Sequence, residues 1–468
     1  MELQLNLLIL LPLAGFIIEI IVPRFFKRME GFSSILFSLL TMCLAFFFCS
    51  NFDTNLKGVQ FIYKYPWIPG WEINFKLALD GIGCIGIMLI STVFFILSII
   101  SKIDKKDYRY YSMIMLLQAF VMGFLVSYDF ILKILFWEAS WIPIFFLLII
   151  SVKKRFALLY SKYWFLSEFL IIVACILLFN NTGVSYDLEK IVQIKIGGER
   201  IFSVIFFFMM AGIMIRAFIF PFDSFLNKSI QACEHNVSII LGAIMPILPF
   251  FFMTSVMLPL FQKEMFNYTN ILAIILLISI FICAIKLFID KKISTIVSTQ
   301  ILLFNAMTFI WLIRPTNNLL QASFEIIVIK ALFNIALIYF GRLIILEYKI
   351  KNNFDRWMFV ICLILSFGLP GIIMTAPLFT LISSWYGIAP YVSILLMVFL
   401  MFIFLYTCIN IIPLFNPKEP SSGYKAVLSV KNILFLIMIF VSLSISIWPD
   451  YIHYFSKNYY RTFIGRNY

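Results

Sequence analysis

The chain has 468 residues, of which 63% are hydrophobic and only 13% are charged, and its formal net charge is +13. Soluble domains are about 45–50% apolar and about 25% charged, so this composition excludes a water-soluble enzyme, a disordered chain and a nucleic-acid-binding domain. Because each helical crossing of a bilayer takes about 20 apolar residues, the sequence predicts an all-α, polytopic membrane protein.

Apolar runs of the required length recur along the whole chain and predict about 14 transmembrane helices. The first run lacks a basic flank and a small-residue cleavage site, which indicates a retained helix and not a removable signal. The predicted crossings are 5–22, 32–49, 81–101, 112–127, 129–151, 164–179, 202–220, 237–261, 270–288, 293–313, 319–345, 357–386, 390–414 and 432–448.

Lys and Arg concentrate in the odd-numbered connections between these runs, for example at Lys102–Arg109 and Lys153–Arg155. Such an asymmetry predicts that the odd connections face the cytoplasm or an equivalent compartment, with both termini on the opposite side. The positive net charge is therefore interpreted as a topology signal. The eight cysteines form no CxxC pair and no Cys/His cluster, so the sequence predicts neither a metal site nor an iron–sulfur site.

Two of the predicted helices are interrupted. Helix seven runs into the polar stretch Pro221–Lys228, and helix twelve contains Gly368-Leu-Pro-Gly371. The two breaks lie five helices apart, which predicts two inverted five-helix repeats, helices 4–8 and helices 9–13, as in transporters with paired broken helices. The alternative is that Gly and Pro are simply common in membrane helices.

This arrangement predicts four parts of the chain. They are an N-terminal part with helices 1–3 and a long loop, a first repeat, a second repeat, and a C-terminal helix 14 with its tail, at residues 1–110, 111–262, 263–416 and 417–468.

A few ionisable residues fall within the apolar runs. A charge at mid-bilayer costs at least about 2.5–3.5 kcal/mol, so it normally faces the protein interior and has a partner there. Glu138 lies half way along helix five, and Arg216 precedes the break in helix seven. Glu325 and Lys330 lie on helix eleven, about 140° apart around the helix, so each needs a partner on another helix or through water.

These four residues are the predicted proton relay, in which Glu138 could change its proton affinity with a nearby cation. Arg216 stays protonated under almost any conditions, so it can shape the field but carries protons poorly. A purely structural role, as permanently paired charges, is the alternative for Glu138 and Arg216. Glu19 and Glu168 are weaker candidates, and Lys133 is expected to extend to the membrane interface.

Several short motifs carry a family resemblance through their order and spacing over roughly residues 60–385. They are Tyr65–Pro69, Phe75–Gly81, Phe136–Pro143, Arg216–Lys228, Asp290–Lys292 with Ser298–Thr299, Leu332–Phe333 with Arg342, and Gly368–Gly371. Together they resemble the antiporter-like membrane subunits of respiratory complex I, and most closely the subunit-4 group. The helix-five segment around Glu138 is the most discriminating of these matches.

The sequence also departs from the pattern of this family. Arg216 stands where the family has a lysine, and Glu325 stands where it has a histidine. The helix-eight lysine falls on Pro249, and the helix-twelve glutamate falls on Leu378. Helices twelve and thirteen, residues 358–415, contain no Asp, Glu, Lys or Arg.

The resemblance implies a proton-translocating subunit of NADH:ubiquinone oxidoreductase that itself holds no cofactor and no metal. NADH, FMN, iron–sulfur clusters and ubiquinone would bind to partner subunits, and this chain would contact neighbouring antiporter-like subunits and lipids but no nucleic acid. It also implies the mitochondrial inner membrane, an organelle-encoded chain and termini in the intermembrane space. The alternatives are a stand-alone cation/proton antiporter and a non-pumping structural subunit of the same complex.

Overall fold

The computed structural model describes residues 5–26, 30–152, 154–182, 186–191, 199–346, 353–366, 375–415, 441 and 449–459. Within these residues the chain is mostly helical, and ten helices are long and apolar enough to cross a membrane. The predicted fold class of a polytopic helical membrane protein is therefore confirmed. The count of about 14 is not confirmed, because predicted helix 14 at 432–448 and the glycine–proline break at 368–371 lie outside the described residues.

The chain divides into two compact units, each described here by itself. The first unit comprises residues 1–213, 251–264 and 451–468, and the second comprises residues 214–250 and 265–450. The four predicted parts and the inverted repeats stay predictions.

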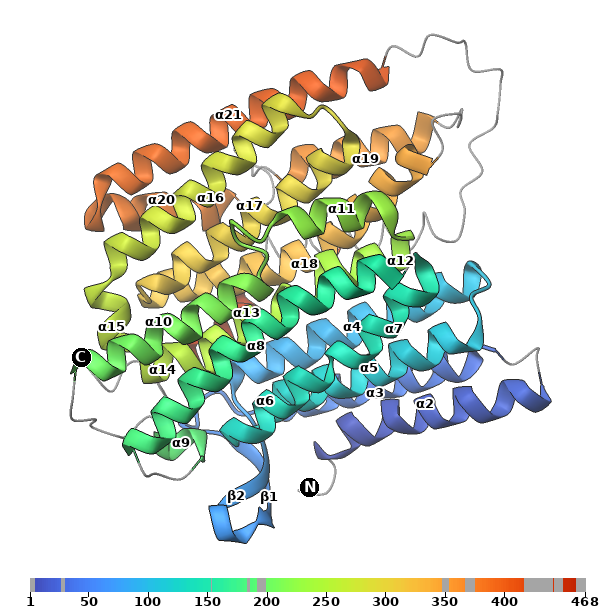
Figure 1. The fold of residues 1–468 in the computed structure, drawn as a ribbon, viewed down its shortest axis with the longest axis vertical. Coiled ribbons are helices and arrows are strands. Elements are labelled where there is room, and N and C mark those ends of the chain that lie inside the picture. The colour runs from blue at the N-terminus through green and yellow to red at the C-terminus, as the bar shows by residue number, and fades with distance from the viewer. Residues whose placement is uncertain are drawn as a thin grey trace. The chain divides into compact units, whose positions relative to one another are not determined.

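The helices of the first unit follow the apolar runs (Figure 1, blue to green). Where helix five was predicted, Pro143 has no N–H for the carbonyl of Ala139, and the run divides into two helices at Ser140. The helices in this unit up to the break in helix seven are α2 (Leu7–Phe25), α3 (Phe32–Ser50), α4 (Gly81–Ile103), α5 (Tyr108–Val126), α6 (Phe130–Ala139), α7 (Trp141–Ser151), α8 (Lys154–Thr182), α9 (Leu188–Ile191) and α10 (Glu199–Arg216), the last of which ends in the second unit.

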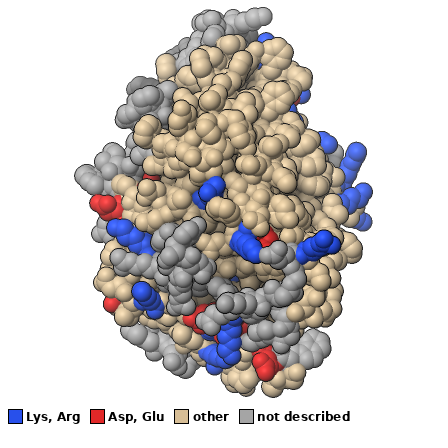
Figure 2. All heavy atoms as spheres, turned by 90° about the vertical axis from the view of Figure 1, so that its left-hand side faces the viewer, with Lys and Arg blue, Asp and Glu red and all other residues tan. Residues whose placement is uncertain are grey.

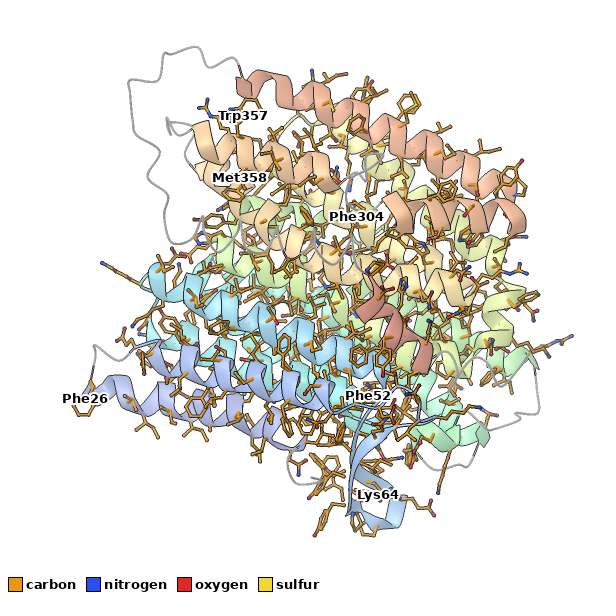
Figure 3. The ribbon with its side chains drawn as sticks, turned by 180° about the vertical axis from the view of Figure 1, so that it is seen from behind. Phe26, Phe52, Lys64, Phe304, Trp357 and Met358 are labelled. Carbon is orange, nitrogen blue, oxygen red and sulfur yellow. The ribbon has the colours of Figure 1, made fainter. Side chains whose placement is uncertain are left out.

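A β-hairpin occupies the first long polar connection, a feature that the helix prediction did not include. Strand β1 (Gln60–Ile68) pairs antiparallel with β2 (Ile73–Leu79), and the short helix η2 (Pro69–Trp71) joins them. Lys64 on β1 is labelled in Figure 3 at this hairpin. Leu77 of β2 also forms a β-bridge with Ser127, so the hairpin is attached to the turn between α5 and α6.

The C-terminal helix α23 (Asp450–Tyr459) belongs to the first unit although it comes last in the chain. Its Phe455 carbonyl lies so close to Gly81, at the start of α4, that a Cβ there would lie 2.1 Å from the oxygen. Phe455 also packs against Phe52, with ring centroids 5.9 Å apart (Figure 3 labels Phe52). Glycine is therefore needed at position 81 for this close approach.

The second unit is built from the remaining long helices and from short pieces (Figure 1, green to orange). Predicted helix eight is a succession of α-helical and π-helical turns in the structure, because its three prolines, Pro246, Pro249 and Pro259, interrupt the ladder of backbone hydrogen bonds. The elements are α11 (Ser224–Ala232), α12 (His235–Ile239), η3 (Ile240–Ile244), α13 (Ile247–Phe252), η4 (Met253–Met257), α14 (Leu258–Leu260), α15 (Gln262–Asn267), α16 (Thr269–Ile289), α17 (Ile293–Ile313), α18 (Asn317–Leu346), α19 (Asn353–Ser366), α20 (Thr375–Ile388) and α21 (Pro390–Phe415), of which the turns from Phe251 to Glu264 belong to the first unit.

Large apolar side chains are exposed along the outer helices, as expected of surfaces that face lipid. Phe169 of α8, Phe288 of α16 and Met401 of α21 are each more than half exposed. On the face shown in Figure 2, the Lys, Arg, Asp and Glu side chains are scattered and mixed in sign, and they form no large patch of one charge.

Candidate functional site

Glu138 lies in the last turn of α6, whose start is fixed by an N-cap. The Asp129 carboxylate accepts hydrogen bonds from the backbone N–H groups of Ile131 and Leu132, at 3.0 and 3.2 Å. At the other end, the Ser140 hydroxyl donates to the Trp137 carbonyl at 2.6 Å. These hydrogen bonds fix both ends of α6 and thereby the orientation of the Glu138 side chain.

The Glu138 carboxylate is half-buried and accepts a hydrogen bond from the indole Nε1–H of Trp164 on α8, at 2.7 Å. Trp164 is itself buried and packs against Tyr160, with ring centroids 5.6 Å apart. The structure therefore places Glu138 against α8 inside the first unit, where a charged acceptor gains a strong hydrogen bond.

Lys133, on the same helix, was predicted to extend to the membrane interface, and this prediction is wrong. Its side chain is buried, with only 2% of the residue exposed. The ammonium group donates to the Phe124 carbonyl at 2.9 Å and lies over the Phe124 ring, 4.8 Å from its centroid. The reason is that Lys133 lies on the inner face of α6, so a backbone carbonyl and an aromatic ring replace water around its charge.

Asp80 forms a second buried acidic position at the junction of β2 and α4. Its carboxylate accepts from the Gly83 N–H at 2.6 Å and is hydrogen-bonded to the Tyr128 hydroxyl. Burial is the main cause that raises the pKa of Asp80 above its usual range, and burial likewise raises the pKa of Tyr128. Sequence analysis noted Asp80 only as part of a motif, because a carboxylate before a helix ordinarily serves as an N-cap.

Glu19, a weaker candidate, has a structural role. It is fully buried on α2, and its carboxylate accepts hydrogen bonds from the Gly31 N–H and the Ser33 hydroxyl. These groups lie at the start of α3, so Glu19 ties that start to α2 and stabilises its orphan backbone donors.

The predicted break in helix seven is confirmed. Helix α10 ends at Arg216 and α11 begins at Ser224, with a cis peptide bond between Phe220 and Pro221. Phe218 has a φ of +57°, in the left-handed region that non-glycine residues rarely adopt. Its ring stacks on that of Phe225, with centroids 5.9 Å apart, so packing on α11 holds the backbone in this conformation.

A side chain of a neighbouring helix replaces the backbone hydrogen bond that the break removes. Pro221 has no N–H to donate to the carbonyl of Ala217, four residues earlier. The amide of Asn305 on α17 donates to that carbonyl at 2.9 Å. The backbone at Ala217, directly after Arg216, is therefore bound to α17.

The same arrangement recurs in predicted helix eight. Pro246 has no N–H to donate to the Gly242 carbonyl, and the amide of Asn334 on α18 donates to it at 3.3 Å. Pro249, at the position of the family's lysine, lies within α13 between the two π-helical segments. The Asn334 amide therefore supplies a donor to this helix seven residues before the position where the family has a charge.

Three of the four predicted relay residues lie in the second unit, and all three are buried. Arg216 is 5% exposed at the end of α10, and Glu325 and Lys330 lie on the inner side of α18. The Lys330 ammonium is in contact with the face of the Phe304 ring on α17, a residue labelled in Figure 3. These observations place cationic and acidic groups inside the bundle, as a charge at membrane depth requires.

Glu138 is the fourth, and it belongs to the first unit. The pairing of Glu138 with Arg216 and the relay role of the four residues stay predictions. Leu378, at the position of the family's helix-twelve glutamate, is a buried apolar residue of α20.

An ion pair that sequence analysis did not identify lies at the break. Asp223, just before α11, forms an ion pair with Lys286 on α16. The sequence marks Asp223 only as part of the polar stretch after Pro221, and it cannot identify the partner because Lys286 lies on a helix more than 60 residues away. Among the described residues, no group of three or more His, Cys, Asp and Glu side chains is arranged to hold a metal ion.

Comparison with known proteins gives the family. The family model described as NADH:quinone oxidoreductase/Mrp antiporter, TM, matches residues 127–409. F(420)H(2) dehydrogenase subunit M of Methanosarcina mazei is 28% identical over 233 residues, which are 47% of each chain. NADH-ubiquinone oxidoreductase chain 4 of Marchantia polymorpha is 24% identical over 270 residues, 56% of this chain and 54% of that one.

Solved structures show the same fold over nearly the full length. A chain of respiratory complex I from Thermus thermophilus with bound NADH has a TM-score of 0.84 at 15% identity. The superposition covers 98% of this chain and 99% of the complex I chain. A chain of the Mrp complex from a Dietzia species has a TM-score of 0.84 at 11% identity. That superposition covers 99% of this chain and 98% of the Mrp chain.

In the sequence alignments, the chain spans about half the length of the curated relatives that it matches. The family model nevertheless covers more than half of the 468 residues, including Glu138, the helix-seven break and α18. The resemblance predicted from the short motifs is thereby confirmed. The chain belongs to the transmembrane family of NADH:quinone oxidoreductase and Mrp antiporter subunits.

Proposed function

We propose that this chain is a proton-translocating subunit in the membrane arm of a respiratory complex I. The relatives named as NADH–quinone oxidoreductase subunits support this proposal. Electron transfer from NADH to ubiquinone takes place in partner subunits, which hold the FMN and the iron–sulfur clusters. This chain itself holds no redox centre and contacts neighbouring antiporter-like subunits and lipids.

The observation that carries the proposal is the position of Glu138. It is a half-buried carboxylate within a membrane helix, and it accepts a hydrogen bond from the Trp164 indole at 2.7 Å. Moving one charge against 100 mV costs about 2.3 kcal/mol, which is comparable to the energy of making or breaking one buried charge pair. A carboxylate that gains and loses a cationic partner in turnover therefore provides an effect of the required size.

The proposed location is the mitochondrial inner membrane, with an organelle-encoded chain and both termini on the intermembrane-space side. The multi-pass helical fold supports an integral membrane location. The Lys- and Arg-rich odd connections support the orientation, because positive loops remain on the matrix-equivalent side.

The test is Glu138→Gln in the intact complex, reconstituted in sealed vesicles. The variant keeps the size of the side chain and its acceptor for Trp164 but cannot carry a proton. We expect NADH:quinone electron transfer to continue while the number of protons moved per NADH falls. Glu72→Gln, at an exposed carboxylate of the hairpin, is the matched control and should leave both quantities unchanged.

A complex with Glu138→Gln that translocates the full number of protons would contradict the proposal. That outcome would favour the non-pumping structural subunit, which the uncharged Pro249 and Leu378 positions also favour. Proton-coupled cation flux through the purified chain alone in liposomes would instead favour the stand-alone antiporter.

A further inference from the structure

The broken segment of helix seven contains a cation that cannot release its proton. Arg216 has a guanidinium that stays protonated at any physiological pH. It is buried at the end of α10, just before the break. If protons pass this point, as the proposed function requires, another group at the break has to accept and release them.

The ion pair between Asp223 and Lys286 provides such a group. The Asp223 side chain is 6% exposed and that of Lys286 is 31% exposed, so the pair extends from the interior towards the surface of the second unit. Lys286 lies three residues before the end of α16 at Ile289, which corresponds to about 4.5 Å along the helix axis. The loop that follows is one of the Lys-rich odd connections, on the predicted matrix side.

Side-chain amides bind backbone carbonyls on the segments that carry this pair. Asn305 fixes the Ala217 carbonyl on the chain that leads to Asp223, and Asn410 of α21 donates to the Leu287 carbonyl at 3.1 Å. Asp290, the carboxylate one turn beyond Lys286, is engaged by the Thr295 hydroxyl at 2.9 Å. The carboxylate on Lys286 is therefore that of Asp223.

The other charged groups on the adjoining segments lie outside this pair. Lys292 lies 3.7 Å from the Asp290 carboxylate, and its side chain is 70% exposed. Lys228 of α11 is exposed. Arg216 supplies a fixed positive charge seven residues before Asp223 in the chain.

We propose that the Asp223–Lys286 ion pair is the site at which protons are taken up from the matrix side and passed towards the interior of the second unit. In the transfer step, the N–H bond of the Lys286 ammonium breaks and an O–H bond forms on the Asp223 carboxylate, which leaves a neutral amine and a neutral carboxylic acid. A hydronium ion at the surface returns a proton to the amine and becomes water, and the acid gives its proton to a water molecule on its inner side, which restores the carboxylate.

This inference rests on the proposed function, and its test uses the same reconstituted complex. Lys286→Arg keeps the positive charge and can keep the ion pair, but a guanidinium does not give up its proton at physiological pH. We expect the variant complex to assemble and to oxidise NADH, while protons moved per NADH fall towards the value of Glu138→Gln. Lys292→Arg makes the same substitution at an exposed site next to the same helix, and it should leave the ratio unchanged.

Lys286→Arg separates proton transfer from a purely structural ion pair because it keeps the positive charge, whereas Asp223→Asn removes the ion pair and the proton acceptor together. If the pair only fastens the break to α16, Lys286→Arg will translocate protons normally, and this result would overturn the inference. Normal translocation by Lys286→Arg together with loss in Glu138→Gln would overturn the inference alone, whereas normal translocation in both would remove the proposed function as well. Loss of translocation in both Lys286→Arg and Asp223→Asn, with Lys292→Arg unaffected, would support the inference.

Discussion

The two units of this protein use their side-chain hydrogen bonds in different ways. In the first unit, side chains and backbone groups bind the charged groups directly, such as the Trp164 indole for Glu138 and the Phe124 carbonyl for Lys133. In the second unit, the side-chain amides of Asn305 and Asn334 bind backbone carbonyls that have lost their donors to proline. The difference indicates that the second unit stabilises its broken backbone with side chains from neighbouring helices.

The largest expected effect is in the first unit, at the attachment of the hairpin. Lys76 is buried and forms ion pairs with Asp187 at 2.8 Å and with Glu189 at 2.5 Å. Lys76→Met leaves the buried Asp187 carboxylate without its cation, which costs about 3–5 kcal/mol. We expect a lower thermal stability of the complex and less of this subunit in the membrane, measured by thermal shift and by quantitative blotting.

The same variant tests the comparison between the units. If the first unit holds its charges structurally at this site, complexes that do assemble with Lys76→Met should keep their normal ratio of protons to NADH. A changed ratio in fully assembled complexes would mean that the hairpin attachment takes part in translocation.

The next effect concerns the amide donors of the second unit. Asn305→Leu preserves the shape of the side chain but leaves the buried Ala217 carbonyl without a donor, at a cost of about 1–3 kcal/mol. Because this carbonyl follows Arg216 directly, we expect a lowered proton ratio in addition to lower stability. Asn55→Leu, at an exposed amide of the first long connection, is the control and should change neither measurement.

A smaller effect is expected when Glu138 loses its hydrogen bond. Trp164→Phe keeps the aromatic packing and removes the Nε1–H donor, at a cost of about 1 kcal/mol, since the carboxylate is only half-buried. We expect a partial reduction of the proton ratio, smaller than that of Glu138→Gln. A full loss in Trp164→Phe would show that the indole itself belongs to the proton path.

The smallest effect concerns the pH dependence of stability at Asp80. Burial raises the pKa of this carboxyl in the folded chain, so the folded state binds a proton that the unfolded state has already lost above pH 3.8. The contribution of Asp80 to the free energy of unfolding is therefore largest below pH 3.8. It is lost as the pH rises from 3.8 to above the raised pKa of the folded state. Asp80→Asn can still cap α4 and should flatten that dependence, measured as the thermal stability of variant and wild type across pH. Identical pH profiles would contradict the raised pKa.

Part of the site could be predicted from sequence because it depends on local signals. Glu138 stands out as a carboxylate in an apolar run, and the break at Pro221 follows from a residue that cannot donate a backbone hydrogen bond. The inward location of Glu325 and Lys330 follows from the cost of exposing charge to lipid. Each of these predictions needs only the residue and its neighbours in the chain.

Other parts could not be predicted because they depend on a partner from another helix. Lys286 was not distinguished from lysines at helix ends until the packing of α16 placed it against Asp223. Lys133 was expected at the interface because the sequence shows how far along the helix a residue lies. It does not show which way the side chain points, and Lys133 points inward. The docking of α23 on Gly81 joins segments more than 350 residues apart.

The sequence by itself determined that this chain is a helical membrane protein, where helix seven breaks, and that Arg216, Glu325 and Lys330 lie in the protein interior. Hydrophobicity, proline geometry and the cost of a charge in lipid are properties of the residues themselves, so they can be read without coordinates. Only the tertiary structure decided which group faces each buried charge and which amide replaces each lost backbone donor. Those choices depend on how helices pack side by side, and packing is set by side chains from distant parts of the chain.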